Sequence, residues 1–218
     1  MASVRSRPSA VEAYSVEPLR ASQLRAAALT LAEAFSADPL LEILAPDQAR
    51  RVKLGPSMMG VLLAYGLRYG RVWANDDASG VAMWLHPESG PTTMPRMLRA
   101  GMWRAPFMLG LDGMSRMSKA MSATEGFHKQ VGRPHWYLMT VGTRTEKQGQ
   151  GLGSHLVELG TSRADAAGVP CYLETGTDSN IAFYRKRGFE VVGQADCYGH
   201  TLTGMIRPPR TAADQRSA

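Results

Sequence analysis

The most constraining feature of the sequence is the run QGQGLGSHLVE, residues 148–158, which places three glycines in five residues directly before an amphipathic helix. Glycine inside a helical first turn costs about 0.5–1 kcal/mol relative to alanine. The run therefore indicates either a tight turn that packs, or a backbone left bare so that an anion can approach. The second alternative has a physical basis, because the first four N–H groups of a helix lack internal partners and lie at its positive end.

Two common phosphate-binding motifs do not fit this run. A P-loop requires G-x-x-x-x-G-K-[ST], and no lysine stands at the required position. The dinucleotide fingerprint requires G-x-G-x-x-G, but its sixth position holds Ser154 or Leu156. What remains is Q-x-x-G-x-G, which starts at Gln148. This pattern is short, so the packing turn and the anion site both stay open at this point.

Periodicity and turn signals predict an alternation of strands and helices along the chain. The predicted strands cover residues 14–19, 72–74, 81–85, 135–143, 171–175, 189–194 and 200–206, and the second and third form a hairpin around Asn-Asp-Asp-Ala-Ser-Gly. The predicted helices cover residues 22–38, with Ser22 as N-cap, 48–67, 152–167 and 181–187. This order in the last third is typical of an α/β protein.

The length of 218 residues suits one domain. We expect it over residues 14–207, with loose tails over 1–13 and 208–218, because both ends are small, polar and proline-bearing. Residues 91–130 hold seven of the thirteen methionines and are predicted to form a helical insert. Methionine adapts to varied ligands, so this insert is either a pliable acceptor wall or an ordinary part of the core.

Charge and apolar content limit the possible partners. The formal charge is +6, but the basic residues are scattered rather than clustered, which disfavours a nucleic-acid partner. No apolar run reaches the roughly 18 residues of a membrane span, and the start lacks the apolar block of a secretion signal. Cys171 and Cys197 lack metal-ligand spacing. We therefore expect a cytoplasmic protein with reduced thiols, no metal, no nucleic-acid partner and no membrane partner.

Two longer runs carry a family resemblance. WYLMTVGTRTEKQGQGLGSHLVE and PCYLETGTDSNIAFYRKRGFEVVG, within residues 135–194, resemble the GNAT superfamily of N-acetyltransferases. The run GRVWANDDASGVAMWLHPES, with the preceding helix that ends AFSADP, resembles the subgroup that includes puromycin N-acetyltransferase. The resemblance implies an α/β (α+β) fold with a mixed, mostly antiparallel twisted sheet, splayed at the acetyl-CoA site and flanked by helices.

The sequence departs from the family pattern at two places. Where the family often reads V-x-P before the glutamine, this chain has Thr143-Arg144-Thr145. The loop length is unchanged, so we expect the turn to survive. Some members carry a catalytic glutamate on the strand before the turn, and that strand offers none here.

The resemblance implies acetyl-CoA as acyl donor and assigns residues to bind it. Backbone groups of Val141, Gly142 and Thr143 would pair with pantetheine, and one N–H near Val141 would polarise the thioester carbonyl. The turn and the helix start would hold the pyrophosphate through Gln148, Gly149, Gln150, Gly151, Leu152, Gly153 and Ser154. Asn180 would bind the pantetheine arm or cap a helix. Arg187, in a basic cluster with Lys147, Arg185 and Lys186, would meet the 3′-phosphate or lie at a solvated helix end.

The resemblance also suggests the groups that move protons. Tyr184, in the family motif N-x-x-x-Y, is the predicted general acid for the departing sulfur, and its alternative role is packing beside Ile181. Glu174 is a candidate base that acts through water, and strand packing or acceptor binding is its alternative. His135 is a second candidate, since imidazole titrates near neutrality. A third option is that no base is needed.

The function expected from the resemblance is acetyl transfer to the primary amine of a small molecule, by direct attack in a ternary complex, with an antibiotic-like xenobiotic as one candidate acceptor. Protein or peptide acetylation and a non-catalytic CoA-binding regulatory module are the alternatives. Asp38, Glu88 and Glu125 are candidates for holding a cationic acceptor. Three tryptophans either line the acceptor wall or belong to the core: Trp73, Trp84 and Trp103. The oligomeric state is expected to be monomer or homodimer.

Overall fold

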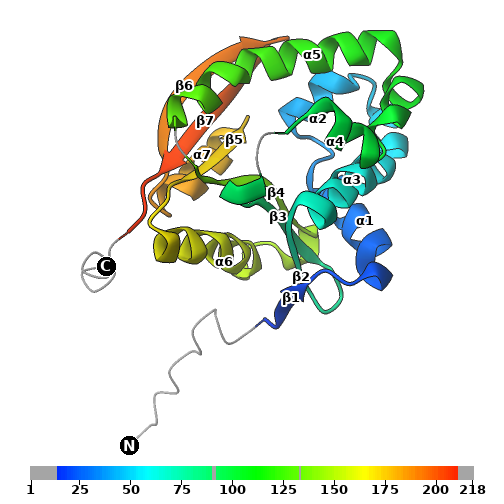
Figure 1. Ribbon diagram of the computed structural model, residues 1–218. Helices are drawn as coiled ribbons and strands as arrows, with labels where there is room; N and C mark the ends of the chain where they lie inside the picture. The colour runs from blue at the N-terminus through cyan, green and yellow to red at the C-terminus, as the bar shows by residue number, and fades with distance from the viewer. Residues whose placement is uncertain (1–13, 90–91, 133, 211–218) are drawn as a thin grey trace, which may run out of the picture.

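The computed structural model describes residues 14–89, 92–132 and 134–210. They form a twisted seven-stranded sheet with helices on both faces (Figure 1). The predicted tail over residues 1–13 lies outside the described residues, and so does the predicted tail from 208 onward except for residues 208–210.

The sheet has the strand order β1-β2-β3-β4-β5-β7-β6. Its strands are β1 (Val16–Pro18), β2 (Gly70–Asn75), β3 (Gly80–Leu85), β4 (Trp136–Thr143), β5 (Cys171–Thr175), β6 (Glu190–Cys197) and β7 (His200–Arg207). Every neighbouring pair is antiparallel except β4 and β5, which are parallel. The predicted fold class, a mixed and mostly antiparallel sheet flanked by helices, is confirmed.

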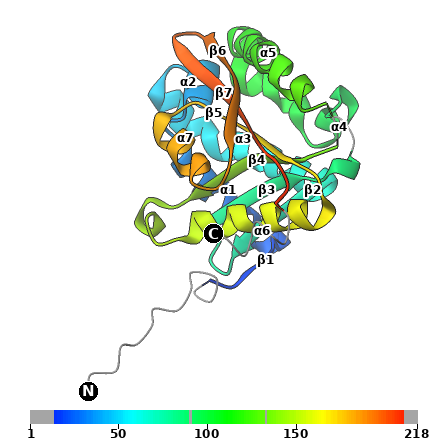
Figure 2. The same cartoon turned by 90° about the vertical axis from the view of Figure 1, so that its left-hand side faces the viewer.

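The helices divide between the two faces of the sheet. They are α1 (Leu24–Ala34), α2 (Pro39–Leu44), α3 (Gln48–Tyr69), α4 (Met94–Arg99), α5 (Ala105–Val131), α6 (Leu152–Ala167) and α7 (Asp178–Arg185). On one face, α6 and α7 cover a core that includes Trp84, Leu138 and Leu173. On the other, α1 and α3 cover the β2–β4 half and α5 covers the β5–β7–β6 half. Figures 1 and 2 both place α5 and α6 on opposite sides of the sheet.

The first helical region differs from the prediction. A 3-10 helix over Ala21–Gln23 includes Ser22, so Ser22 is not the N-cap of α1, which begins at Leu24. The chain leaves α1 after Ala34 and then starts α2, a helix that the periodicity did not predict. Asp38 caps α2 by accepting a hydrogen bond from the Leu40 N–H, and proline suits the first helical position because its missing N–H would have no partner there.

The predicted helical insert is present as α4, a 3-10 turn over Met102–Arg104, and α5. The 27-residue α5 is interrupted at Gly110, whose φ of 71° lies in the left-handed region that favours glycine. The insert contributes Met108, Met114 and Met117 to the core against α1 and α3. Several of its methionines therefore pack as ordinary core residues.

The packing of α6 on the sheet depends on a helical glycine. Gly160 lies directly against the indole ring of Trp84, and a Cβ added there would overlap the ring. At the far end of α6, the carboxylate of Asp165 accepts two hydrogen bonds from Arg207 of β7, at 2.7 and 2.8 Å. Both side chains of this ion pair are buried. Together these contacts fix α6, and hence its N-terminus, relative to the sheet.

Cys171 and Cys197 are buried free thiols. Burial raises the pKa of Cys171 to about 12, so its thiol stays protonated at neutral pH. In the ranges 14–89, 92–132 and 134–210, no helix is both long enough and apolar enough to span a bilayer.

We predict that Gly160→Ala destabilises the protein by about 1–3 kcal/mol, because the new methyl group must displace the buried Trp84 ring. The matched control is Gly126→Ala in α5, where an added Cβ meets nothing within 4 Å. That control should leave stability unchanged or raise it by about 0.5–1 kcal/mol. Urea unfolding of the two variants measures the difference. Equal stability of the two variants would contradict the role given to Gly160.

Candidate active site

The candidate site lies where β4 and β5 part. The two strands pair only over Trp136–Leu138 and Cys171–Leu173. Beyond these residues β4 continues beside β3, and β5 continues beside β7. Backbone groups alternate in direction along a strand, so those of β4 that point away from β3 after Leu138 have no strand partner among the described residues. The splay expected from the family resemblance is thus present.

A β-bulge in β4 coincides with the parting of the strands. Trp84 pairs with Leu138 and Met83 with Thr140, which leaves Met139 as the extra residue. A bulge changes which face the following side chains occupy. Accordingly Leu138 and Val141, three residues apart, both pack on the α6 side. Gly142 instead faces α1, and an added Cβ would lie 2.8 Å from that of Ala34.

The glycine turn leads from β4 into α6. Gly149 and Gly151 have φ values of 72° and 93°, in the region that favours glycine, and Gly151 is the N-cap of α6. Gly153 is different. It lies inside the helix, and an added Cβ would meet only the Thr143 methyl carbon, at 3.8 Å. Neither backbone conformation nor packing within the described chain requires glycine at position 153.

The amides of this turn are bare. In the described part of the chain, no carbonyl or side chain accepts a hydrogen bond from the N–H groups of residues 149–154. They lie at the positive end of a 16-residue helix. Unpartnered N–H groups, positive helix charge and a missing Cβ at Gly153 together form a cradle that suits a pyrophosphate. The residues present therefore fit the diphosphate of coenzyme A.

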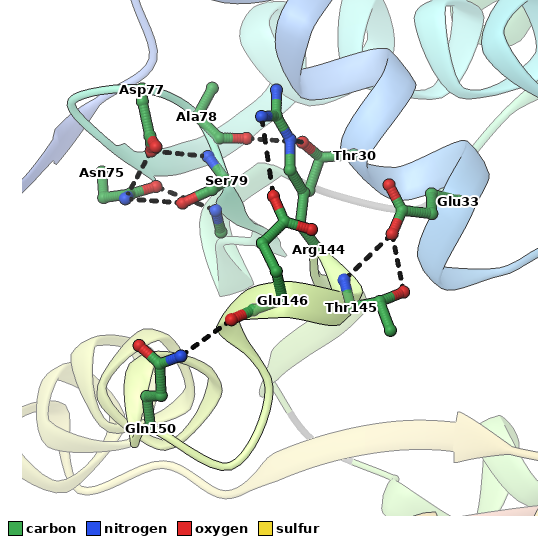
Figure 3. Close-up of polar contacts among 11 residues, drawn as sticks. Thr30, Glu33, Asn75, Asp77, Ala78, Ser79, Arg144, Thr145, Glu146 and Gln150 are labelled. Carbon is green, nitrogen blue, oxygen red and sulfur yellow. Dashed lines mark hydrogen bonds and ion pairs between the residues drawn. The ribbon is translucent and has the colours of Figure 1, made fainter.

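The segment that replaces V-x-P is anchored by polar contacts (Figure 3). Thr145 donates from its N–H and its hydroxyl to the Glu33 carboxylate of α1, at 3.0 and 2.6 Å. These bonds lower the pKa of Glu33. Arg144 donates from Nε to the Thr30 hydroxyl at 3.2 Å. The turn survives the departure from the family pattern, as expected, because polar contacts to α1 hold it.

The β2–β3 hairpin supports the same segment. The Asn75 amide donates to the Asp77 carboxylate at 2.7 Å, and the Gly80 N–H donates to the Asn75 side chain at 2.8 Å. This closed turn presents the Ser79 carbonyl to the Arg144 N–H at 2.8 Å. Figure 3 shows the polar contacts of Asn75 and, at the other end of the segment, Gln150, whose amide donates to the Glu146 carbonyl at 2.7 Å. The glycine turn is therefore held at both ends.

Tyr184 lies on the α6 side of the sheet. It is 8% exposed and packs edge-to-face against Phe183 and Phe189. Among the described residues, none forms a hydrogen bond that affects the pKa of its hydroxyl. Burial raises the pKa of Tyr184, the nearby Arg187 charge opposes this shift, and Asp38 adds to it. The phenol therefore stays protonated at neutral pH and is available as a donor.

The other predicted residues of α7 have mixed outcomes. Thr177, not Asn180, caps the helix, because the Thr177 hydroxyl accepts from the Asn180 N–H at 3.2 Å. The half-buried Asn180 side chain is left to other partners. Arg187 donates to the Ser154 hydroxyl in the first turn of α6, and its guanidinium lies 3.5 Å from the Phe183 ring centroid. Arg187 thus lies beside the cradle, whereas Arg185 and Lys186 are exposed.

Glu174 lies on the opposite face, under α5. Its carboxylate accepts hydrogen bonds from Tyr137 of β4 at 2.7 Å and from Tyr172 of β5 at 3.0 Å. The first bond spans the point where the strands part. His128 of α5 covers both tyrosine rings, and its Nε2 lies 2.8 Å from that of His135. The two tyrosines were not among the predicted site residues, although strand alternation places Tyr172 and Glu174 on one face.

Of the three acceptor-binding candidates, Asp38 is the one whose charge acts on Tyr184. Burial raises the pKa of the Asp38 carboxyl, and the Asp38 charge in turn raises the pKa of Tyr184. Its neighbour Pro39 packs against Gly176 at the end of β5, where an added Cβ would lie 2.8 Å away. Glu88 is exposed near His86, and Glu125 is exposed and paired with Lys129.

A buried arginine fixes the loop that carries Asp38. The guanidinium of Arg51 donates to the carbonyls of Ser36, Ala45 and Pro46 at 2.8–3.0 Å. It also contacts the Glu42 carboxylate at 3.1 Å. Of the tryptophans considered for the acceptor wall, Trp73 and Trp84 belong to the core under α6, and Trp103 is exposed.

Comparisons with known proteins agree with this architecture. The model of the acetyltransferase (GNAT) family matches residues 113–189. An uncharacterized N-acetyltransferase of Schizosaccharomyces pombe is 27% identical over 204 residues, which is 88% of this chain and 83% of that protein.

Solved structures share the fold. One from Corynebacterium glutamicum, described as histone acetyltransferase HPA2 and related acetyltransferase, has a TM-score of 0.68 at 23% identity and covers 91% of this chain and 97% of its own. Arylalkylamine N-acetyltransferase 2 from Aedes aegypti has a TM-score of 0.62 at 14% identity and covers 90% and 99%. The narrower resemblance to the puromycin N-acetyltransferase subgroup stays a prediction. The matching family model and the curated relative support the resemblance to the GNAT superfamily of N-acetyltransferases, and the solved structures share its fold.

Proposed function

We propose that this protein is an acetyl-CoA-dependent N-acetyltransferase that acetylates the primary amine of a small molecule. The observation that carries the proposal is the presence of three features around the parting of β4 and β5. These are the bare amides of residues 149–154, the unpaired edge of β4 and the protonated hydroxyl of Tyr184. Acetyl-CoA has a diphosphate, an amide-bearing arm and a thioester, which match these features in chemistry.

The chain can hold the donor through its backbone. The amides of residues 149–154 bind the diphosphate, with Gln148 at the entrance to the turn and Arg187 beside Ser154. The freed groups of β4 at Val141, Gly142 and Thr143 pair with the amide-bearing arm as an added strand would. Asn180, half-buried on α7, is placed to hydrogen-bond the same arm. An unpaired N–H near the bulge polarises the thioester carbonyl.

The proposed proton acceptor and proton donor lie on opposite faces of the sheet, where β4 and β5 part. The amine attacks the thioester carbonyl carbon, a C–N bond forms, and the C–S bond breaks. Glu174, through water, takes the proton that the amine loses, and hydrogen bonds from two tyrosine hydroxyls hold its carboxylate in place. Tyr184, on the other face, donates a proton to the departing sulfur. The nearby Arg187 charge stabilises the phenolate that results.

The acceptor side favours a small molecule over a polypeptide. Met97 of α4 packs in a cluster with Tyr137 and Met139 at the parting of the strands. The insert therefore covers the sheet face from which the amine must approach. Asp38, whose charge acts on Tyr184, supplies a carboxylate that suits a cationic amine.

The direct test is an acetyl-CoA thiol-release screen with puromycin, aminoglycosides, polyamines and short peptides. Turnover with a small amine supports the proposal. Turnover with peptides alone would indicate the protein acetyltransferase alternative. Tight CoA binding without turnover on any amine would indicate a regulatory CoA-binding module.

We predict that Gly153→Ala weakens acetyl-CoA binding about tenfold, because the methyl group enters the cradle. The fold should tolerate it, since the Cβ meets no described atom closer than 3.8 Å. Isothermal titration calorimetry measures the affinity, and urea unfolding checks the fold. Gly126→Ala, also at an open helical position, is the control. Unchanged acetyl-CoA affinity in a folded Gly153→Ala protein would contradict the role of the cradle in diphosphate binding.

Tyr184→Phe is expected to lower kcat about 10²-fold, with acetyl-CoA affinity within about twofold, because it removes only the donor hydroxyl. Tyr198→Phe, at an exposed tyrosine, serves as control. Since burial raises the pKa of Tyr184, wild-type kcat should show no decline from loss of its proton up to about pH 10. Steady-state kinetics across pH measure both effects. Full activity of Tyr184→Phe would exclude the acid role.

Glu174→Gln is expected to lower kcat/KM about 10²-fold, because the amide cannot accept the amine proton. Its oxygen can still accept a hydrogen bond from one of Tyr137 and Tyr172, and its NH2 group can donate to the hydroxyl oxygen of the other. The loss should shrink at high pH, where more of the amine is already neutral. Glu125→Gln, on the exposed face of α5, is the matched control. An equal loss at every pH would instead point to a packing or acceptor-binding role.

A further inference from the structure

The insert carries an exposed apolar surface that the proposed reaction does not use. Trp103, Phe107 and Leu111 are 55%, 84% and 89% exposed. They alternate with the buried residues Ala105, Leu109 and Gly113 of α5. Met94 and Leu98 of the neighbouring α4 are exposed as well. We call Met94, Leu98, Trp103, Phe107 and Leu111 the insert surface. Large exposed apolar side chains in a group mark an interaction site.

The insert surface is also positively charged. Between Glu88 and Asp112 the sequence has no acidic residue, and it has three arginines. Arg99 and Arg104 are exposed, and the Arg104 guanidinium lies 5.0 Å from the Trp103 ring centroid. Asp112, at the edge, is already paired with Arg116 at 2.8 Å. Apolar side chains flanked by arginines match the interface of a bilayer with an anionic surface.

We propose that the insert surface docks on an anionic lipid bilayer. A second copy of the chain fits less well, because two such surfaces would bring their arginines face to face. Aliphatic side chains such as Leu98 and Leu111 suit acyl chains, which need no directional partner. Docking at the membrane surface needs no membrane-spanning helix. It revises the expectation of no membrane partner, which rested on the absence of a long apolar run.

The place of the insert surface fits this role. The start of α5 and α4 lie beside α3 at the edge of the molecule, on the side away from α6 and α7 (Figure 1). Docking there leaves the glycine turn at the start of α6 open to a soluble donor. The inference does not depend on the transferase proposal, because the insert surface shares no residue with the proposed donor site.

The test uses the full chain with vesicles of phosphatidylcholine alone or mixed with phosphatidylglycerol. Trp103 is a built-in reporter, since the other three tryptophans are buried. We expect co-sedimentation and a blue shift of tryptophan emission with the mixed vesicles only, weakened by salt. Changing Arg99 and Arg104 to Gln should reduce partitioning about fivefold for each arginine. Changing Phe107 and Leu111 to Ser should reduce it about tenfold or more for each side chain.

The control pair is Arg25→Gln with Leu29→Ser, a basic and an apolar residue exposed one turn apart on α1. These changes should leave vesicle binding unchanged. Thermal melting shows whether each variant is folded. No binding to mixed vesicles, or equal binding to both kinds, would overturn the proposal. A dimer in solution that Phe107→Ser dissociates would assign the insert surface to a second copy instead.

Discussion

The candidate site depends on the short pairing between β4 and β5, which ends before either strand does. β4 and β5 are joined over three residues each and then part at the bulge around Met139. A buried backbone group without a partner costs about 1–3 kcal/mol, so a closed sheet would be the more stable arrangement for these strands alone. The gap persists because other elements hold each strand separately: β3 and α1 hold β4, and β7 and α2 hold β5. Groups that are not satisfied within the fold are thereby kept available for a ligand.

The same parting separates two chemical environments. On the α6 side, Tyr184 is enclosed by aromatic rings, and burial keeps its phenol protonated. On the α5 side, the carboxylate of Glu174 accepts hydrogen bonds from two tyrosine hydroxyls. A substrate carbonyl between the strands would have a proton donor on one face and an acceptor on the other. This division follows from strand alternation together with helices that cover both faces.

Polar contacts compensate for the departures from the family pattern. Thr145 replaces the usual proline, and its two hydrogen bonds to Glu33 hold the turn by attraction instead of by ring stiffness. On the acceptor side, Arg51 donates hydrogen bonds to three backbone carbonyls and so fixes the loop that carries Asp38. Both anchors are polar side chains from helices α1 and α3, which makes the helical layer part of the site rather than a cover alone.

The sequence by itself determined the elements of the last third and the glycine turn that leads into α6. The glycine spacing, the helix after it and the motif that ends at Tyr184 are local patterns, and local sterics and hydrogen bonding govern them. Tertiary structure decided the rest. The N-cap of α7 is Thr177 rather than the candidate Asn180, and α2 forms where no periodicity indicated a helix. The partners of Glu174 and the burial of Asp38 come from segments far apart in the chain. Such contacts depend on how layers pack, and no short stretch of sequence encodes that.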